Sequence, residues 1–228
     1  MKKSVRNPAT STSARASGGL GQVRLIGGRW RGSKLPVVDV PGLRPTSDRV
    51  RETLFNWLGP VLPGARVLDL FAGSGALGLE ALSRGAASAV LVEREPALAL
   101  CLLDATRRLP GGDAASVVQA DALAWLPAQP RSSFDIAFVD PPFDDGLWGK
   151  VLPALLPLLS EAAWLYVEAP LLVPIALPAG WSLHREGRTR EVRYALYRRV
   201  PATAAVATDT LANDPPHAGA SPDEPSTE

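Results

Sequence analysis

The segment Asp140-Pro141-Pro142-Phe143 combines residue types suited to chemistry on an aromatic amine. Such an amine is a weak nucleophile because its lone pair is delocalised into the ring. Hydrogen bonds accepted by the Asp140 carboxylate and the Pro141 carbonyl would turn that lone pair out of the ring plane. Pro142 restricts Pro141 to extended geometry, and Phe143 offers a face on which a base can stack. The segment predicts a site that orients an amine towards an electrophile, although an ordinary Asp-Pro turn is the structural alternative.

A second motif, residues 67–78, turns from an apolar run through glycines into a helix-forming segment. Gly73 and Gly75 allow a tight turn that comes close to a ligand, and the helix that follows presents unpaired N–H groups at its start. With Gly78, the spacing also matches the dinucleotide fingerprint, which is a weak signal by itself. The motif predicts a nucleotide pocket.

Acidic residues follow four successive predicted strands, namely Asp69, Glu93, Asp121 and Asp140. Ligands of an open parallel sheet bind beyond the carboxyl ends of its strands. Glu93 would accept hydrogen bonds from both hydroxyls of a ribose, and Asp121 would accept one from the amino group of an adenine. Any one of these acids would be interpreted as a helix cap or a solvated carboxylate, but several in register favour a nucleoside-shaped ligand.

Alternating strands and helices must position these residues. Strands are expected over residues 66–70, 89–92, 116–119, 134–139 and 163–168, and helices over residues 76–84 and 95–108. This order predicts right-handed crossovers and a parallel sheet, closed by an antiparallel hairpin over residues 181–199. Residues 147–159 are expected to form two short helical pieces or a kinked helix, because Pro153 and Pro157 interrupt them.

Two smaller elements are expected before this sheet. Residues 23–37 predict a β-hairpin with Gly27-Gly28 as its turn, and its Trp30 either stacks on a base or packs the hairpin onto the main domain. The start signals Thr46, Ser47 and Asp48 open a helix that should lie near the cofactor pocket. Its apolar face is predicted to hold Val50, Leu54, Trp57 and Leu58, leaving Arg49, Arg51 and Glu52 outside.

The net charge of +1 conceals a strong asymmetry. Residues 1–58 contain eleven basic residues (Lys and Arg) and three acidic ones (Asp and Glu), and residues 59–180 contain seven basic and thirteen acidic residues. Residues 181–200 contain six basic and two acidic residues, and residues 201–228 contain no basic and five acidic residues. The two basic flanks predict a polyanionic partner, and we favour nucleic acid over a merely solubilising surface. The candidate RNA-binding residues are Arg24, Arg29, Arg31, Lys34, Arg44, Arg188 and Arg190.

The composition of the 228 residues, 46% of them hydrophobic, suits one enzyme domain with tails. Cys101 is the one cysteine, so neither an internal disulfide nor a Cys-based metal site is possible, and we expect a buried thiol in a reducing compartment. The first residues lack the apolar region of a secretory signal, and prolines and charges interrupt residues 151–177. A cytoplasmic protein without membrane contact is expected.

The glycine turn and the Asp140 segment together resemble the S-adenosylmethionine-dependent methyltransferases that modify exocyclic amines. More specifically, Arg24-Leu25-Ile26-Gly27-Gly28 and residues 43–58 resemble the bacterial RsmD family, which methylates N2 of guanine 966 in 16S ribosomal RNA. The resemblance covers residues 23–199. It implies an α/β, Rossmann-like class I methyltransferase fold, with a mostly parallel seven-stranded sheet, an antiparallel last strand and a small N-terminal hairpin and helix extension.

The resemblance also assigns roles to residues. S-adenosylmethionine would be held by Thr46, Asp69, Phe71, Gly73, Gly75, Glu93 and Asp121. The guanine, flipped from its stack, would be held by Asp140, Pro141, Pro142 and Phe143, and no metal is implied. The implied partner is 16S ribosomal RNA in the small subunit or its assembly intermediate, and a monomer is expected.

Four parts of the chain are expected: a disordered basic arm (1–20), the hairpin and helix extension (21–60), the methyltransferase domain (61–200) and a disordered acidic tail (201–228). Alternatives stay open for the function. The same turn would serve another nucleobase amine, such as adenine N6, in RNA or DNA. Gly73, Gly75, Gly78 and Glu93 would suit an NAD-dependent dehydrogenase, and a non-catalytic RNA-binding or ribosome assembly factor is the third alternative.

Overall fold

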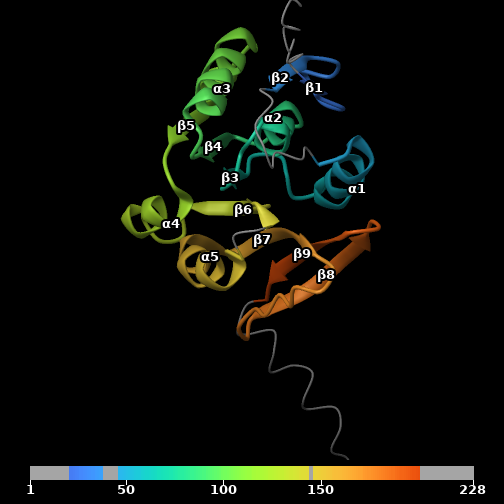
Figure 1. Cartoon of the computed structure of the whole chain (residues 1–228), viewed down its shortest axis with the longest axis vertical. Helices are drawn as coiled ribbons and strands as arrows, with labels where there is room; N and C mark the ends of the chain where they lie inside the picture. Colours follow the sequence, from blue (N-terminus) through green and yellow to red (C-terminus); the bar gives the residue numbers. More distant parts are fainter. Residues whose placement is uncertain (1–20, 38–45, 144–145, 201–228) are drawn as a thin grey trace, which may run out of the picture.

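A seven-stranded sheet runs through the part of the chain that the computed structural model describes, residues 21–37, 46–143 and 146–200 (Figure 1). The strand order is β5-β4-β3-β6-β7-β9-β8. The parallel strands are β3 (Arg66–Asp69), β4 (Ser88–Glu93), β5 (Ala115–Gln119), β6 (Phe134–Val139) and β7 (Leu159–Pro170). β9 (Val192–Arg199) lies antiparallel between β7 and β8 (Trp181–Arg188), which confirms the predicted antiparallel last strand.

Strand order reverses next to β3. The chain builds outwards from β3 to β4 and β5, and then returns to place β6 on the other side of β3. An open α/β sheet binds its ligands at such a switch point, outside the carboxyl ends of the strands. The fold therefore predicts a ligand site at the carboxyl ends of β3, β4 and β6.

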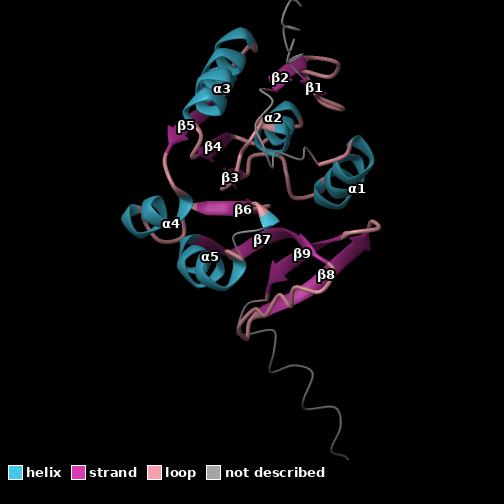
Figure 2. Cartoon of the chain, in the orientation of Figure 1, coloured by secondary structure: helices cyan, strands magenta, loops and turns pink. Residues whose placement is uncertain are grey.

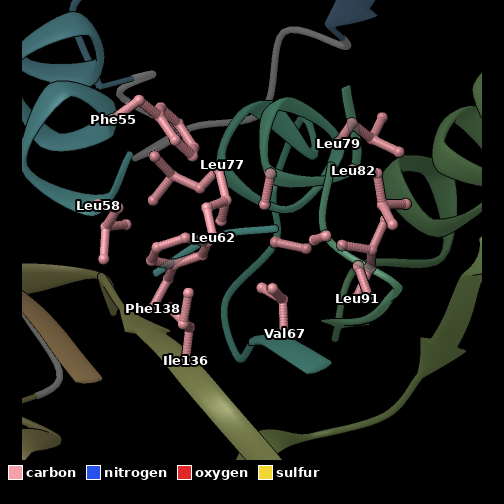
Figure 3. Close-up of a cluster of buried hydrophobic side chains, with 14 of the residues drawn as sticks. Phe55, Leu58, Leu62, Val67, Leu77, Leu79, Leu82, Leu91, Ile136 and Phe138 are labelled. Carbon is pink, nitrogen blue, oxygen red and sulfur yellow. The ribbon is translucent and has the colours of Figure 1, made fainter. Parts of the chain in front are cut away.

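Helices cover both faces of this sheet (Figure 2). They are α1 (Asp48–Leu58), α2 (Ala76–Ser83), α3 (Pro96–Arg108), α4 (Ala122–Trp125) and α5 (Trp148–Leu155). Side chains alternate across each strand, so that Val67 joins the core under α1, α2 and α3, while Leu68 joins the core under α4 and α5. Figure 3 shows the first core, in which Phe55 from α1 packs edge-on against Phe138 from β6.

The N-terminal hairpin consists of β1 (Gly21–Arg24) and β2 (Lys34–Val37). The predicted turn at Gly27-Gly28 is wrong, because Arg24 pairs with Lys34 and the connection spans residues 25–33. The glycines instead pack against the end of α2, where a Cβ on Gly28 would lie 1.9 Å from the Ser83 carbonyl oxygen. Trp30 is buried and its indole N–H donates to the Pro110 carbonyl oxygen at 3.0 Å, so it packs the hairpin onto the domain.

Helix α1 begins as expected, with the Ser47 hydroxyl accepting a hydrogen bond from the Val50 N–H. The expectation for Arg51 is wrong: the side chain is fully buried rather than outside the apolar face. Residues 51, 54, 55 and 58 have the i, i+3, i+4, i+7 spacing of one helical stripe, and Arg51 occupies its first position. Ion pairs with Asp48 and Glu80 make that burial tolerable.

Two other expectations concern α5 and Cys101. Helix α5 is followed by a short 3₁₀ helix, Leu156–Leu158, so the predicted two pieces are present and the change of helix type falls beside Pro157 rather than at Pro153. Cys101 is only half-buried, contrary to the expected buried thiol, because it lies beside the exposed Leu100 at the margin of the buried face of α3.

In the described ranges, no helix is both long and apolar enough to cross a membrane. Likewise, no group of three or more His, Cys, Asp or Glu residues within them is placed to hold a metal ion. The expected arm (1–20), the expected tail (201–228) and Arg44 lie outside the described residues.

Candidate active site

The chain leaves β3 through the predicted glycine turn and enters α2. Gly73 and Gly75 both have positive φ, 52° and 75°, a backbone conformation that favours glycine. A Cβ on Gly75 would also lie 2.5 Å from the Leu102 side chain, so α3 packs directly on the turn. Phe71, which precedes the glycines, is half-buried against the core under α4 and α5.

Glu93 ties this turn to the end of β4. One of its carboxylate oxygens accepts a hydrogen bond from the Gly73 N–H at 2.8 Å, and the other accepts from the Glu95 N–H at 2.7 Å. A carboxylate has about four acceptor positions, so each oxygen keeps capacity for a further donor. Glu93 therefore positions the turn and still presents acceptors at the edge of the sheet.

Asp69 ends β3 and is buried, with 3% of its surface exposed. Its carboxylate accepts a hydrogen bond from the Gly78 N–H at 2.9 Å, in the first turn of α2. Burial raises the pKa of Asp69 to about 7; the Gly78 hydrogen bond opposes the shift and the charge of Glu93 adds to it. Asp69 thus holds the start of α2 against the end of β3.

Asp121, after β5, is exposed and serves as the N-cap of α4, since its carboxylate accepts from the Ala124 N–H at 3.1 Å. One carboxylate oxygen of Asp121 therefore caps the helix, as the structural alternative expected. The residue nevertheless lies at the same edge of the sheet as Glu93, because β4 and β5 pair in parallel with Glu93 opposite Gln119.

Asp140 follows β6 and faces a cluster of polar groups. The Thr46 hydroxyl oxygen lies 3.4 Å from the Asp140 carboxylate and 3.5 Å from that of Glu168, at the end of β7. Burial raises the pKa of Asp140 well above its usual range, the charges of Glu168 and Asp69 raise it further, and the Thr46 hydroxyl opposes the shift. The structure thus brings Thr46, Asp69 and Asp140 to one region.

The rest of the Asp140 segment presents both polar and aromatic groups. Pro141 is buried, Pro142 is exposed and Phe143 is half-buried. The Phe143 ring lies 6.1 Å from that of Trp148 at an interplanar angle of 42°, so one side of it is supported from α5. The Leu70 N–H donates to the Phe138 carbonyl oxygen at 3.1 Å, which joins the start of the glycine turn to the strand that carries Asp140.

Sequence reasoning missed Glu168 and Tyr166 in this cluster. The Tyr166 hydroxyl donates to the Glu168 carboxylate at 2.9 Å, and the Trp148 indole N–H donates to the Glu168 carbonyl oxygen at the same distance. A signal was available, because Glu168 follows an apolar strand just as Asp69, Glu93 and Asp140 do.

The basic candidates fall into two groups. Arg24, Arg29, Arg31 and Lys34 are exposed on the hairpin and its connection, and Arg188 and Arg190 are exposed at the tip of β8 and β9. Some are engaged within the protein: the Arg29 guanidinium stacks over the Trp30 ring at 4.5 Å, and Arg188 pairs with Glu186 at 3.2 Å. Figure 1 places the hairpin and the β8–β9 pair at different ends of the molecule.

The chain is similar to known proteins over most of its length. The model of the family described as "Conserved hypothetical protein 95" matches residues 23–198. The "Ribosomal RNA small subunit methyltransferase D" of Escherichia coli K12 is 52% identical over 188 residues, which cover 79% of this chain and 92% of the relative.

Two solved structures are also similar to this chain. "Putative methyltransferase yhhF" from Escherichia coli is 51% identical with a TM-score of 0.72, covering 79% of this chain and 99% of its own. An RNA methyltransferase from Salinibacter ruber, solved in complex with S-adenosyl-L-homocysteine, shares the fold at 18% identity and a TM-score of 0.53, covering 70% of this chain and 95% of its own.

Proposed function

The chain belongs to the RsmD family, the family described as Conserved hypothetical protein 95, and we propose that it transfers a methyl group from S-adenosylmethionine to N2 of guanine 966 in 16S ribosomal RNA. One observation carries the chemistry. The Asp140-Pro141-Pro142-Phe143 segment leaves the carboxyl end of β6, directly beside β3 and its glycine turn, at the point where strand order reverses. In this proposal, the segment that binds the amine and the turn that binds the nucleotide lie at the same carboxyl edge of the sheet.

The donor and acceptor groups at this edge suit S-adenosylmethionine. Glu93 keeps acceptor capacity for the ribose hydroxyls, and Asp121 has a carboxylate oxygen beyond the one that caps α4. Gly73 and Gly75, whose positive φ values favour glycine, have no side chains that would obstruct a ligand at the turn. When bound, S-adenosylmethionine supplies a methyl group on a positively charged sulfur.

The residues of the chain orient the nucleophile. Asp140 and the Pro141 carbonyl accept the two N–H hydrogens of the guanine amine, so that its lone pair faces the methyl carbon. The nitrogen forms a bond to that carbon as the carbon–sulfur bond breaks, and the electrons of the broken bond stay with sulfur. The nitrogen then carries a positive charge and releases one proton to the Asp140 carboxylate.

Two observations on other parts of the chain support ribosomal RNA as the substrate. The relative from Escherichia coli is named a small-subunit ribosomal RNA methyltransferase and is similar over 79% of this chain. The family model covers residues 23–198, which include most of the hairpin and all of α1. Two groups of exposed basic residues lie on the hairpin and at the β8–β9 tip, where RNA phosphates would contact them. A guanine inside a folded RNA would have to be flipped out to reach Asp140.

The test is to supply methyl-labelled S-adenosylmethionine with small ribosomal subunits, protein-free 16S RNA or DNA, and to locate the labelled base by digestion and mass spectrometry. The proposal predicts N2-methylguanine at position 966, in assembled or partly assembled subunits. Label on adenine N6, on DNA alone or on another ribosomal position would overturn the assignment of the substrate. Absence of label on all three substrates would overturn the assignment as a methyltransferase.

A further inference from the structure

Two carboxyl groups and two hydroxyl groups meet at the ends of β6 and β7. The Thr46 hydroxyl lies 3.4 Å from Asp140 and 3.5 Å from Glu168, and the Tyr166 hydroxyl donates to Glu168 at 2.9 Å. The Thr46 hydroxyl has one hydrogen, so it donates a hydrogen bond to only one of the two carboxylates at a time. The Tyr166 hydroxyl donates to Glu168 alone. Glu168 is therefore the better stabilised of the two as an anion.

The backbone fixes this arrangement. β6 and β7 pair in parallel with Val139 opposite Val167, so the next residue of each strand, Asp140 and Glu168, emerges at the same level of the sheet. The Trp148 indole N–H donates to the Glu168 carbonyl oxygen at 2.9 Å and holds that end of β7 against α5. The register of the sheet therefore keeps the backbone of Asp140 beside that of Glu168.

We propose, on the basis of the proposed function, that Glu168 is a positioning residue that acts through Asp140. Its negative charge makes Asp140 the more basic member of the pair, so that Asp140 takes up the proton released by the methylated amine. Glu168 itself does not touch the amine. Burial and the like charge of Glu168 both raise the pKa of Asp140, in agreement with this role.

Other titratable groups also act on the pair and on Tyr166. The charge of Asp69, from β3, also raises the pKa of Asp140, and Tyr194, from β9, acts on Tyr166. Glu168 is the neighbour whose charge most affects Asp140.

The decisive variant is Glu168→Gln, which keeps the size and the acceptor oxygen of the side chain but removes its charge. The pKa of Asp140 should then fall, so the acid limb of the kcat profile moves to lower pH by about one unit. A weaker base should also lower kcat on the alkaline plateau, about three- to tenfold. The profiles of the variant and the native protein should therefore cross.

Glu161→Gln is the matched control, because Glu161 lies on the same strand but is exposed. Its profile should match that of the native protein. Tyr166→Phe is a second variant: without the hydroxyl, Glu168 is protonated more readily and the acid limb should again move to lower pH. An unchanged profile, or a loss of kcat that is equal at every pH, in both Glu168→Gln and Tyr166→Phe would overturn the proposal.

A measurement without substrate separates this proposal from the proposed function. In the protein free of S-adenosylmethionine, Glu168→Gln should raise the melting temperature at pH 8, where two enclosed like charges repel, and should change it less at pH 4.5. Glu161→Gln should change it at neither pH. No pH-dependent difference would overturn the coupling of the two carboxyl groups, whereas loss of methyl transfer in the native protein would count against the proposed function alone.

Discussion

At the scale of single residues, the acids at the strand ends have a structural task as well as the proposed binding task. Glu93 holds the Gly73 and Glu95 N–H groups, and Asp69 holds the Gly78 N–H. Sequence reasoning identified both acids from their position after apolar strands. It did not identify Glu168, because only the acids at the ends of the first four predicted strands of the sheet were interpreted as ligands. It placed Arg51 outside the apolar face because charge was interpreted as a sign of exposure.

We predict that Asp69→Asn flattens the pH dependence of stability in the protein without S-adenosylmethionine. The pKa of Asp69 is about 7 in the folded state and near 4 in the unfolded state, so the folded state binds more protons between these values. Stability is then highest at low pH and falls as pH rises through this window. Between pH 5 and pH 8, the free energy of unfolding of the variant, measured by urea unfolding, should decrease by about 3 kcal/mol less than that of the native protein.

The control for this prediction is Asp113→Asn, at an exposed position in a short 3₁₀ helix. Its decline in stability should equal that of the native protein. Asp140 and Glu168 also have raised pKa values, so part of the decline should persist in Asp69→Asn. A variant with the full native decline would contradict the titration assigned to Asp69.

We predict that Glu93→Gln weakens the binding of S-adenosylmethionine about tenfold or more, measured by calorimetry. The carboxylate accepts from two backbone N–H groups and, in the proposed function, from ribose hydroxyls, and hydrogen bonds to charged groups contribute about 1.5–3 kcal/mol. Glu95→Gln is the matched control, since the exposed Glu95 side chain does not cap α3. Equal affinity in both variants would remove Glu93 from the proposed site.

At the scale of elements, Glu80 joins the hairpin and α1 to α2. Its carboxylate accepts from the Ile26 and Gly27 N–H groups, both at 2.7 Å, and pairs with Arg84 at 2.8 Å and Arg51 at 3.6 Å. Both Glu80 and Arg51 have fully buried side chains. One buried carboxylate thus joins the hairpin, α1 and α2, in addition to the contacts that Trp30 and Gly28 make with the main domain.

We predict that Glu80→Ala destabilises the protein by about 3–5 kcal/mol, because it leaves Arg51 buried without its acidic partner on α2. Chemical denaturation gives this value directly. Asp104→Ala serves as the control: its pair with Arg107 is exposed and should contribute under about 1 kcal/mol. Similar losses in the two variants would show that Glu80 stabilises the fold no more than an exposed ion pair does.

Most helices and strands were predictable because the spacing of apolar residues determines their type and position. β6 and α3 lie where the pattern placed them, and Pro96 starts α3 as its fixed φ suggests. The turn of the hairpin was not predictable, because Gly27 and Gly28 are required by contact with α2 rather than by a tight turn. That contact joins residues more than 50 positions apart, which local rules do not address.

At the scale of the whole molecule, the basic groups are separated, while the acids of the proposed site gather at the carboxyl edge of the sheet. Charge counts along the sequence predicted the two basic flanks but not their spacing in the fold. In the proposed function, RNA contacts the hairpin and the β8–β9 tip while the target base reaches Asp140.

We predict that RNA binding weakens steeply with salt, and that Arg31→Ala and Arg188→Ala each reduce the slope of log K against log salt by about one. Each lost phosphate contact releases one counterion fewer. Arg131→Ala is the control, because Arg131 is exposed just before β6 and belongs to neither basic group. Binding of the native protein that is insensitive to salt would contradict the role of both basic groups.

The most direct test of the account is the single-turnover rate of methyl transfer by Asp140→Ala, with its affinities for S-adenosylmethionine and RNA measured alongside. The account predicts that both affinities stay within a few-fold of the native values while the rate falls by about a hundredfold or more, since the amine loses its acceptor. Transfer at a near-native rate would contradict the central claim that Asp140 orients the amine and takes up its proton.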